Sequence, residues 1–87
     1  MKWKQKVKLI KEEKTYLAMG DKKKEVPEED KLIIDLMENG ITDDDLLIRE
    51  VSVYENADEI LAKLRLAQFV EDYGDFIEAA EPSKLFE

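Results

Sequence analysis

The first candidates for a functional site are four acidic residues near the C-terminal end of the sequence: Glu71, Asp72, Asp75 and Glu78. We call this set the acidic ridge, because Glu71, Asp75 and Glu78 have the spacing i, i+4, i+7 of one helix face. No lysine or arginine lies between Arg65 and Lys84 to pair with them along the chain. Like charges four residues apart destabilise a helix by roughly 0.2 to 0.5 kcal/mol, a small cost that folding alone does not explain. The acidic ridge is therefore either a contact surface for a basic partner or a solubilising face.

A second acidic group, Asp43-Asp44-Asp45, raises the question of a metal site, because carboxylate oxygens are the ligands that Ca²⁺ and Mg²⁺ prefer. An EF-hand loop requires oxygen ligands at alternate positions, a glycine at the sixth and a glutamate at the twelfth, and this spacing is absent. Thr42 precedes the three aspartates, and a hydroxyl followed by acidic residues is typical of a helix start. We therefore predict a helix N-terminus and no metal site. Asp43, Asp44 and Asp45 remain candidates for contact with a partner.

Catalytic chemistry has little support in the sequence. Histidine and cysteine, which most often supply a base near neutral pH or a thiolate nucleophile, are both absent. Ser52 and Ser83 therefore have no histidine to activate them, and no glycine-rich loop for a phosphate is present. Paired carboxylates could perform acid–base chemistry only in a cleft that a chain of 87 residues hardly provides. We expect a protein that is not an enzyme and that uses no cofactor.

Lysine occupies every second position from Lys2 to Lys8, and this period of two predicts a β-strand with the lysines on one face. Trp3, Val7 and Leu9 fall on the opposite face. We therefore expect Trp3 in the core, rather than among the lysines as a ring on which nucleic-acid bases stack.

Charge is distributed unevenly along the chain. Residues 1–24 hold nine lysines and three acidic residues, a net charge of +6, whereas residues 25–87 hold five basic and nineteen acidic residues, a net charge of −14. So much negative charge repels a polyanion, which makes direct nucleic-acid binding the disfavoured interpretation. The favoured one is a solvated lysine face that protects a strand edge from pairing with other chains.

Residues 1–26 predict an antiparallel β-hairpin or a three-stranded meander. The strand from Lys2 to Ile10 is followed by a second from Thr15 to Met19, which is rich in residues that suit a pleated surface. Gly20-Asp21 is a tight-turn signal, and Lys22 to Val26 form a short third strand.

Two helix starts are expected in the next part of the chain. Pro27 and the acidic residues after it begin a helix with one apolar stripe, which Asn39-Gly40 closes with Ile41 packing back on it. Thr42 caps the start of a second helix. The β-branched residues between Arg49 and Tyr54 leave a strand open as the alternative there.

The longest periodic segment begins at Asn56, which we predict to be an N-cap with Glu59 as the capping-box partner. A long helix follows, bent or interrupted at Gly74 and ended before Pro82. Its predicted buried stripe contains Ile60, Leu61, Leu64, Ala67, Val70, Tyr73, Ile77 and Ala80. The aromatic residues Tyr16, Phe69, Phe76 and Phe86 exceed what so small a core covers, so we expect Phe69 and Phe76 in an apolar contact surface.

The combined prediction is a single small α+β domain over residues 1–87. It has an N-terminal antiparallel β-hairpin or three-stranded meander over residues 1–26 and two or three α-helices over 27–81, the C-terminal helix long. Residues 82–87 form a tail.

The predicted function is that of a non-enzymatic acidic protein-binding module. We expect a small regulator or inhibitor that occupies a basic surface of a partner protein, such as a surface that otherwise holds nucleic acid. The alternative is a structural or assembly protein that forms homo-oligomers through exposed apolar residues.

The sequence disfavours a membrane-spanning or secreted protein. No apolar run approaches the roughly 20 residues that span a bilayer, and the first residues alternate lysine with apolar side chains where a signal peptide has an apolar core. We expect a cytoplasmic protein without membrane contact. In general character the chain is similar to many small acidic proteins of phages and mobile elements, a likeness that carries no function over.

Overall fold

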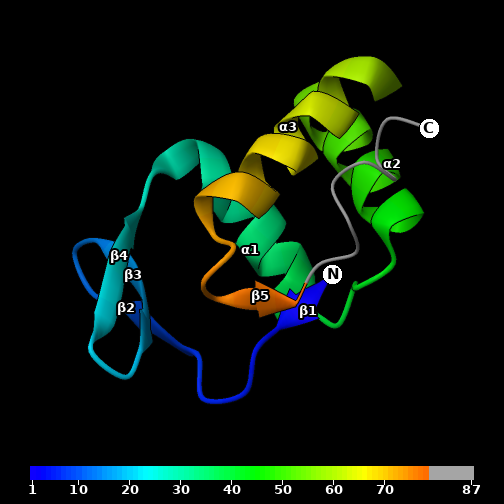
Figure 1. Cartoon of the computed structure of the whole chain (residues 1–87). Coiled ribbons are helices and arrows are strands. Elements are labelled where there is room, and N and C mark those ends of the chain that lie inside the picture. Colours follow the sequence, from blue (N-terminus) through cyan, green and yellow to red (C-terminus); the bar gives the residue numbers. More distant parts are fainter. Residues whose placement is uncertain (79–87) are drawn as a thin grey trace.

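The structure, a computed structural model, describes residues 1–78 and confirms the α+β class, with a three-stranded antiparallel sheet followed by three α-helices. Figure 1 shows that sheet at one end of the molecule, the pair α2 and α3 at the other, and α1 between them. The elements are β1 (Lys2–Trp3), β2 (Lys8–Lys11), β3 (Thr15–Met19), β4 (Lys22–Val26), the 3-10 helix η1 (Glu28–Asp30), α1 (Lys31–Glu38), α2 (Asp44–Glu55), α3 (Glu59–Asp72) and β5 (Ile77–Glu78).

The predicted meander is present as the sheet β2-β3-β4, in which every neighbouring pair is antiparallel. Gly20 adopts a φ of +59° in the turn between β3 and β4, a conformation that glycine takes without steric cost. Leu17 lies opposite Leu9 on β2 and Lys24 on β4. Leu17 is buried, so the face of the sheet that carries it is the inner one.

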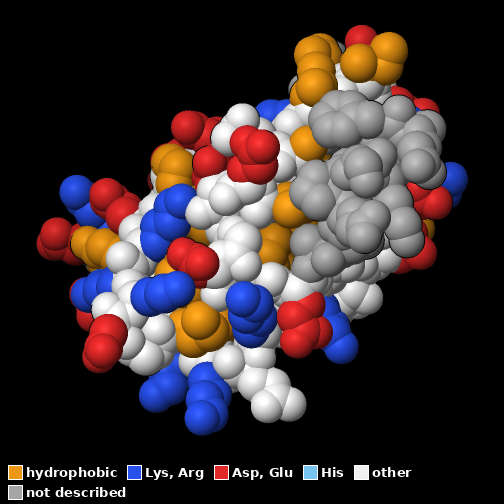
Figure 2. Space-filling model, viewed as in Figure 1, with side chains coloured by type: hydrophobic (Ala, Val, Ile, Leu, Met, Phe, Trp, Pro, Cys, Tyr) orange, Lys and Arg blue, Asp and Glu red, His pale blue; other side chains and the backbone are white. Residues whose placement is uncertain are grey.

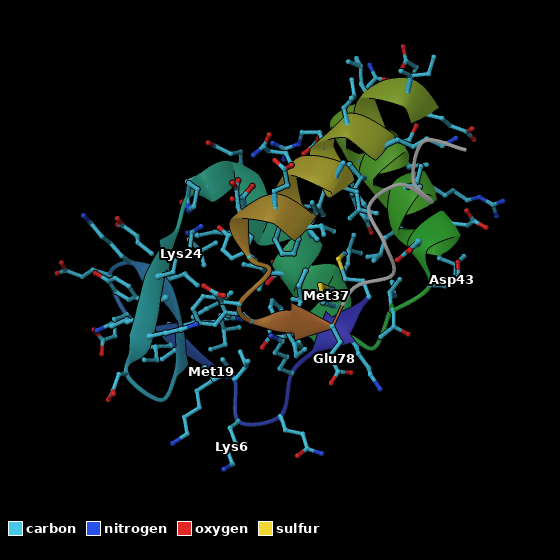
Figure 3. The ribbon with its side chains drawn as sticks, viewed as in Figure 1. Lys6, Met19, Lys24, Met37, Asp43 and Glu78 are labelled. Atoms are coloured by element: carbon cyan, nitrogen blue, oxygen red, sulfur yellow. The ribbon has the colours of Figure 1, made fainter. Side chains whose placement is uncertain are left out.

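The predicted strand from Lys2 to Ile10 is wrong in its continuity. The chain turns after β1, where the Val7 amide donates to the Lys4 carbonyl at 3.4 Å and Lys6 adopts a φ of +72°. Figure 3 shows the Lys6 side chain pointing away from the body of the molecule. As a result β1 pairs with β5 in a separate two-stranded sheet, and only β2 joins the meander. Trp3 nevertheless packs against the core as a half-buried residue, as predicted in part.

The first helix and its end follow the prediction closely. Pro27 precedes η1, which leads directly into α1. At the other end Gly40 has a φ of +90° and its amide donates to the Met37 carbonyl at 3.0 Å, while the Ile41 amide donates to the Leu36 carbonyl at 3.1 Å. Ile41 then packs against the core, the hydrophobic contact that such caps require.

The second helix resolves the open alternative for residues 46–54, which are helical throughout. The predicted N-cap, Thr42, is off by one residue: Asp43 is the N-cap, and its Oδ1 accepts from the Leu46 amide at 3.1 Å. Asn56 does not begin the next helix as predicted but ends this one, with a left-handed φ of +50° that asparagine tolerates.

The third helix differs from the prediction at both ends. Asp58 is its N-cap, accepting from the Leu61 amide at 2.8 Å, and the helix stops at Asp72 instead of continuing past Gly74. Beyond it, the Phe76 amide donates to the Tyr73 carbonyl at 2.8 Å, and this turn brings β5 alongside β1. The predicted tail, with Phe86, and Ala80 of the predicted stripe lie outside the described residues.

Tyr73 contacts residues of three elements, η1, α3 and β4. Its hydroxyl donates to Asp30 Oδ2 at 2.7 Å, its ring lies 4.4 Å from that of Phe69, and Lys24 Nζ lies 4.6 Å from its ring centroid. Burial, followed by the hydrogen bond to Asp30 and the negative charge of that carboxylate, raises the pKa of the Tyr73 hydroxyl well above its usual value.

Within residues 1–78 no helix has the length and apolar character to cross a membrane.

Candidate protein-interaction surface

The acidic ridge does not exist as a ridge on one helix. Because α3 ends at Asp72, Asp75 and Glu78 lie outside it, Glu78 in β5. Lysines distant in sequence neutralise these two: Lys22 Nζ lies 3.4 Å from Asp75 Oδ1, and Lys2 Nζ lies 3.5 Å from Glu78 Oε2. The first pair links β4 to the turn after α3, and the second links β1 to its neighbouring strand β5.

Glu71 and Asp72 differ from Asp75 and Glu78 in their ion pairing. Neither carboxylate forms an ion pair with a described residue, and both residues are exposed. Asp72 Oδ1 accepts from Gln68 Nε2 at 3.0 Å, and the Lys24 ammonium donates to the Asp72 carbonyl rather than to its carboxylate. Figure 3 places Lys24 on β4, beside the C-terminal end of α3. Within residues 1–78, these two are the carboxylates of the predicted ridge that have no ion-pair partner.

The three predicted aspartates at residues 43–45 serve the start of α2. Asp43 caps the helix, and Asp44 lies 3.3 Å from the N-terminal ammonium of Met1. In the described part of the chain no group of acidic side chains is arranged to hold a metal ion. Asp43 and Asp45 are both exposed and neither forms an ion pair with a described residue. The Asp43 carboxylate is engaged as the helix cap, so this run forms no coherent contact surface.

The prediction that Phe69 and Phe76 form an apolar contact surface is wrong. Phe69 is 1% exposed and Phe76 is 4% exposed, and both belong to the core. For Phe69 the physical reason is the rotation of α3, which turns Ala62, Leu66, Phe69 and Val70 inward at positions i, i+4, i+7 and i+8. Phe76 lies beyond α3, in the turn that leads to β5, and its carbonyl accepts from the Lys4 amide at 3.0 Å.

The opposite face of α3 exposes the residues that we expected to be buried. Ile60 is 71% exposed, Leu61 52% and Leu64 48%, and we call these three residues the α3 face. At the end of the neighbouring helix, Val53 and Tyr54 are also exposed. Figure 2 shows hydrophobic side chains gathered at the tip where α3 begins. Contiguous apolar exposure of this kind marks interaction sites in soluble proteins.

A groove runs beside the α3 face. It has a volume of about 390 Å³ and is lined by Glu55, Ala57, Leu61, Leu64, Arg65 and Gln68. Arg65 fixes one wall, because its Nη2 lies 2.7 Å from Glu55 Oε1 and also donates to the Glu29 carbonyl. Leu61 and Leu64 of the same helix and Ala57 also line the groove, so it offers an apolar slot with an ion pair at its margin.

The sequence contains a feature that indicates which face of α3 is buried, although the apolar periodicity alone does not distinguish the two faces. Segment 59–72 contains two apolar stripes, one through Ile60, Leu61 and Leu64 and one through Ala62, Leu66 and Phe69. Only the second extends to an aromatic residue at each of its last two turns, Phe69 and Tyr73, and large aromatic rings supply the most buried area.

The lysine-rich hairpin presents a mixed surface. On its outer face Lys23 Nζ lies 4.5 Å from the ring centroid of Tyr16, and Lys14 pairs with Glu25 at 3.2 Å. On the inner side Lys11 pairs with Glu38 of α1 at 3.2 Å. Ion pairs and cation–π contacts thus engage Lys11, Lys14 and Lys23 within the molecule.

Comparisons with protein-family models, with curated proteins and with solved structures found no match to this chain. Function must therefore be argued from the surface itself.

Proposed function

We propose that this protein is a non-enzymatic protein-binding module, a small acidic regulator or inhibitor whose α3 face docks on a basic, apolar-centred surface of a partner protein. The observation that carries the proposal is the exposure of Ile60, Leu61 and Leu64 beside an apolar groove. Fully burying one such side chain is worth roughly 1.5 to 3 kcal/mol, so a partner that covers all three gains a substantial driving force.

The charge of the helical pair supports a basic partner. Residues 44–72 contain three basic and eight acidic residues, a net charge of −5. A partner with positive charge around its apolar centre is attracted to this surface, and acidic proteins are rejected. The effect acts mainly on the association rate and on specificity, which suits a regulator that must select one target.

The same charge disfavours the alternative, a homo-oligomer formed through the helical pair. In a dimer formed through this surface, two helical pairs that each have a net charge of −5 would face each other. Like charges that face each other across an interface lower the affinity. Self-association is tested directly by sedimentation velocity from about 10 to 500 µM, a range that spans interactions of moderate strength. A dimer that disappears on substitution of the α3 face would replace the proposed function with the assembly function.

The test of the proposed function compares variants of the α3 face with a matched control. The variant Leu61→Ser with Leu64→Ser should abolish capture of the partner from host lysate, because it removes the apolar centre without touching the core. The control is Leu46→Ser in the first turn of α2, since Leu46 is exposed to the same degree as Leu64 but does not line the groove. Retention of the same captured proteins by the double variant would contradict the proposal.

A further inference from the structure

The outward face of α3 changes in character along its length. Its first half is the apolar α3 face, Ile60, Leu61 and Leu64, and its second half continues through Gln68 to Glu71 and Asp72. Leu64, Gln68 and Glu71 are spaced i, i+4, i+7, so they lie in one row on the helix. Glu71 and Asp72 have no ion-pair partner among residues 1–78. Apolar and acidic contacts are thus segregated along one axis rather than mixed.

The separation of the two halves has a defined length. Leu64 and Glu71 are seven residues apart, which corresponds to a rise of about 10.5 Å, or two helical turns. An extended chain covers that distance in about three residues, whereas a helix covers it in about seven and presents a side chain at every turn. Leu61, Leu64, Arg65 and Gln68, which line the groove, span two turns of α3, and an apolar groove of this kind can receive the apolar face of an amphipathic helix.

We propose that the element bound by the α3 face is an amphipathic α-helix of the partner that carries apolar anchors at one end and lysine or arginine residues about two turns away. This inference rests on the proposed function and names the partner's structure and charge pattern. The apolar anchors fill the groove beside Leu61 and Leu64, and the basic residues meet Glu71 and Asp72.

A second copy of α3 is a poor occupant of its own face in either orientation. In a parallel pair the Glu71 carboxylates of the two copies meet, and like charges repel. In an antiparallel pair the Glu71 of one copy lies against the Ile60 and Leu61 region of the other, where a carboxylate loses water without gaining a partner. The separation of apolar from acidic residues along α3 therefore favours a partner helix whose apolar and basic residues are separated in the same way.

The test uses blocked 14-residue peptides and measures binding by isothermal titration calorimetry. The first peptide is an amphipathic helix with leucines on its first two turns and lysines two turns later. The second has the same composition, with lysines interspersed among the leucines on the same face. The third is the first peptide with proline at its centre, which breaks the helix. We expect the first to bind at least 10-fold more tightly than the second and the third to lose binding.

Charge reversal isolates the acidic half of the surface. The variant Glu71→Lys with Asp72→Lys should weaken binding of the first peptide at least 10-fold, and a peptide with its lysines changed to glutamate should restore it. The control is Glu12→Lys with Glu13→Lys in the exposed turn between β2 and β3, which makes the same change in net charge far from α3 along the chain.

The outcomes separate this inference from the proposed function. Equal binding of the segregated and interspersed peptides, or no effect of the charge reversal at residues 71 and 72, overturns the helix inference. If no peptide binds, the inference is also overturned, while loss of partner capture by the Leu61→Ser and Leu64→Ser variant still supports the proposed function. If that capture is retained as well, both are overturned.

Discussion

The sheet end and the helical-pair end of this molecule differ in their apolar residues, since the highly exposed large apolar side chains of the described chain all lie in α2 and α3. At the sheet end Lys22, Lys11 and Lys14 each lie within 4 Å of a carboxylate of the same chain, and Leu17 and Val26 are buried. At the other end Ile60 and Leu64 are exposed.

The comparison teaches where to look for a partner in a protein without recognisable motifs. Charges that are satisfied within the chain serve the fold, because each ion pair ties one element to another. Apolar side chains left in water beside unpaired acidic groups do not serve the fold, since burial would stabilise them further. Exposed apolar side chains identify the α3 face as a candidate contact surface, and the ion pairs remove Asp75 and Glu78, half of the acidic ridge, from consideration.

The largest expected effect separates the two faces of α3. Phe69→Ala, on the buried face, should lower the free energy of unfolding by about 3 to 5 kcal/mol, the usual cost of emptying a buried aromatic site. Leu64→Ser, on the exposed face of the same helix, should change it by less than about 0.5 kcal/mol. Urea denaturation followed by circular dichroism measures both. A large loss for Leu64→Ser would mean that this face is part of the core.

An intermediate effect is expected at Trp3, in β1. The side chain is half-buried and lines, with Val7, Leu9 and Leu17, a cleft of about 340 Å³ between the two sheets. Trp3→Ala should lower the free energy of unfolding by about 2 kcal/mol, less than a fully buried ring, because part of the indole already contacts water. The fluorescence of this single tryptophan reports the same packing. A loss below about 0.5 kcal/mol would show that the ring contributes nothing to the core.

A smaller effect with a pH signature is expected at Tyr73. Tyr73→Phe removes the hydrogen bond to Asp30 and should cost about 1 kcal/mol at neutral pH. In the unfolded chain a tyrosine ionises near pH 10, whereas the pKa of the buried Tyr73 hydroxyl is raised. Above about pH 10 ionisation therefore stabilises only the unfolded state, and the free energy of unfolding falls as the pH rises.

The control for this pH effect is the same phenylalanine variant. Lysines also lose protons in alkaline solution, but they do so in both proteins. The wild-type curve between about pH 9 and 11 should therefore fall more steeply than that of Tyr73→Phe, and the difference belongs to Tyr73. Parallel curves would contradict the raised pKa.

Local chemistry was enough to predict the elements whose signals lie within a few residues. Gly20 and Gly40 sit where a positive φ is needed, and Ile41 completes a cap that the sequence Asn39-Gly40-Ile41 predicts. The fold class followed from these signals and from the strand at Thr15–Met19.

The rest depended on contacts that a one-dimensional pattern does not contain. Lys6 breaks the alternating strand with a left-handed conformation that nothing in the lysine pattern indicates. The rotation of α3 about its axis determines which of its two apolar stripes is buried. Packing against the rest of the core sets that rotation, with Tyr73 and Phe69 buried. The partner of Asp75 is Lys22, on a strand far away in the sequence.

The smallest expected effect divides the acidic ridge itself. Asp75→Asn with Glu78→Gln breaks the ion pairs to Lys22 and Lys2 and should lower the free energy of unfolding by up to about 1 kcal/mol, since both pairs are exposed. That loss should shrink in high salt, which screens the pairs in the wild type. Glu71→Gln with Asp72→Asn breaks no ion pair within residues 1–78. Both carboxylates lie in the last turn of α3, at the negative end of the helix dipole, so stability should hold or rise by about 0.3 to 1 kcal/mol.

The two double variants carry the same change in charge, which makes each the control for the other. Lys22→Gln should reproduce part of the Asp75→Asn loss and add nothing to it when the two are combined, because a single contact is removed in both cases. Urea denaturation at about 0.05 and 0.5 M NaCl measures all of these variants, since the lower salt leaves surface pairs largely unscreened and the higher salt screens them. If both double variants lose the same stability, the ridge is a uniform solvated face. A loss confined to residues 75 and 78 would assign those two carboxylates to the fold and leave Glu71 and Asp72 free to meet a partner.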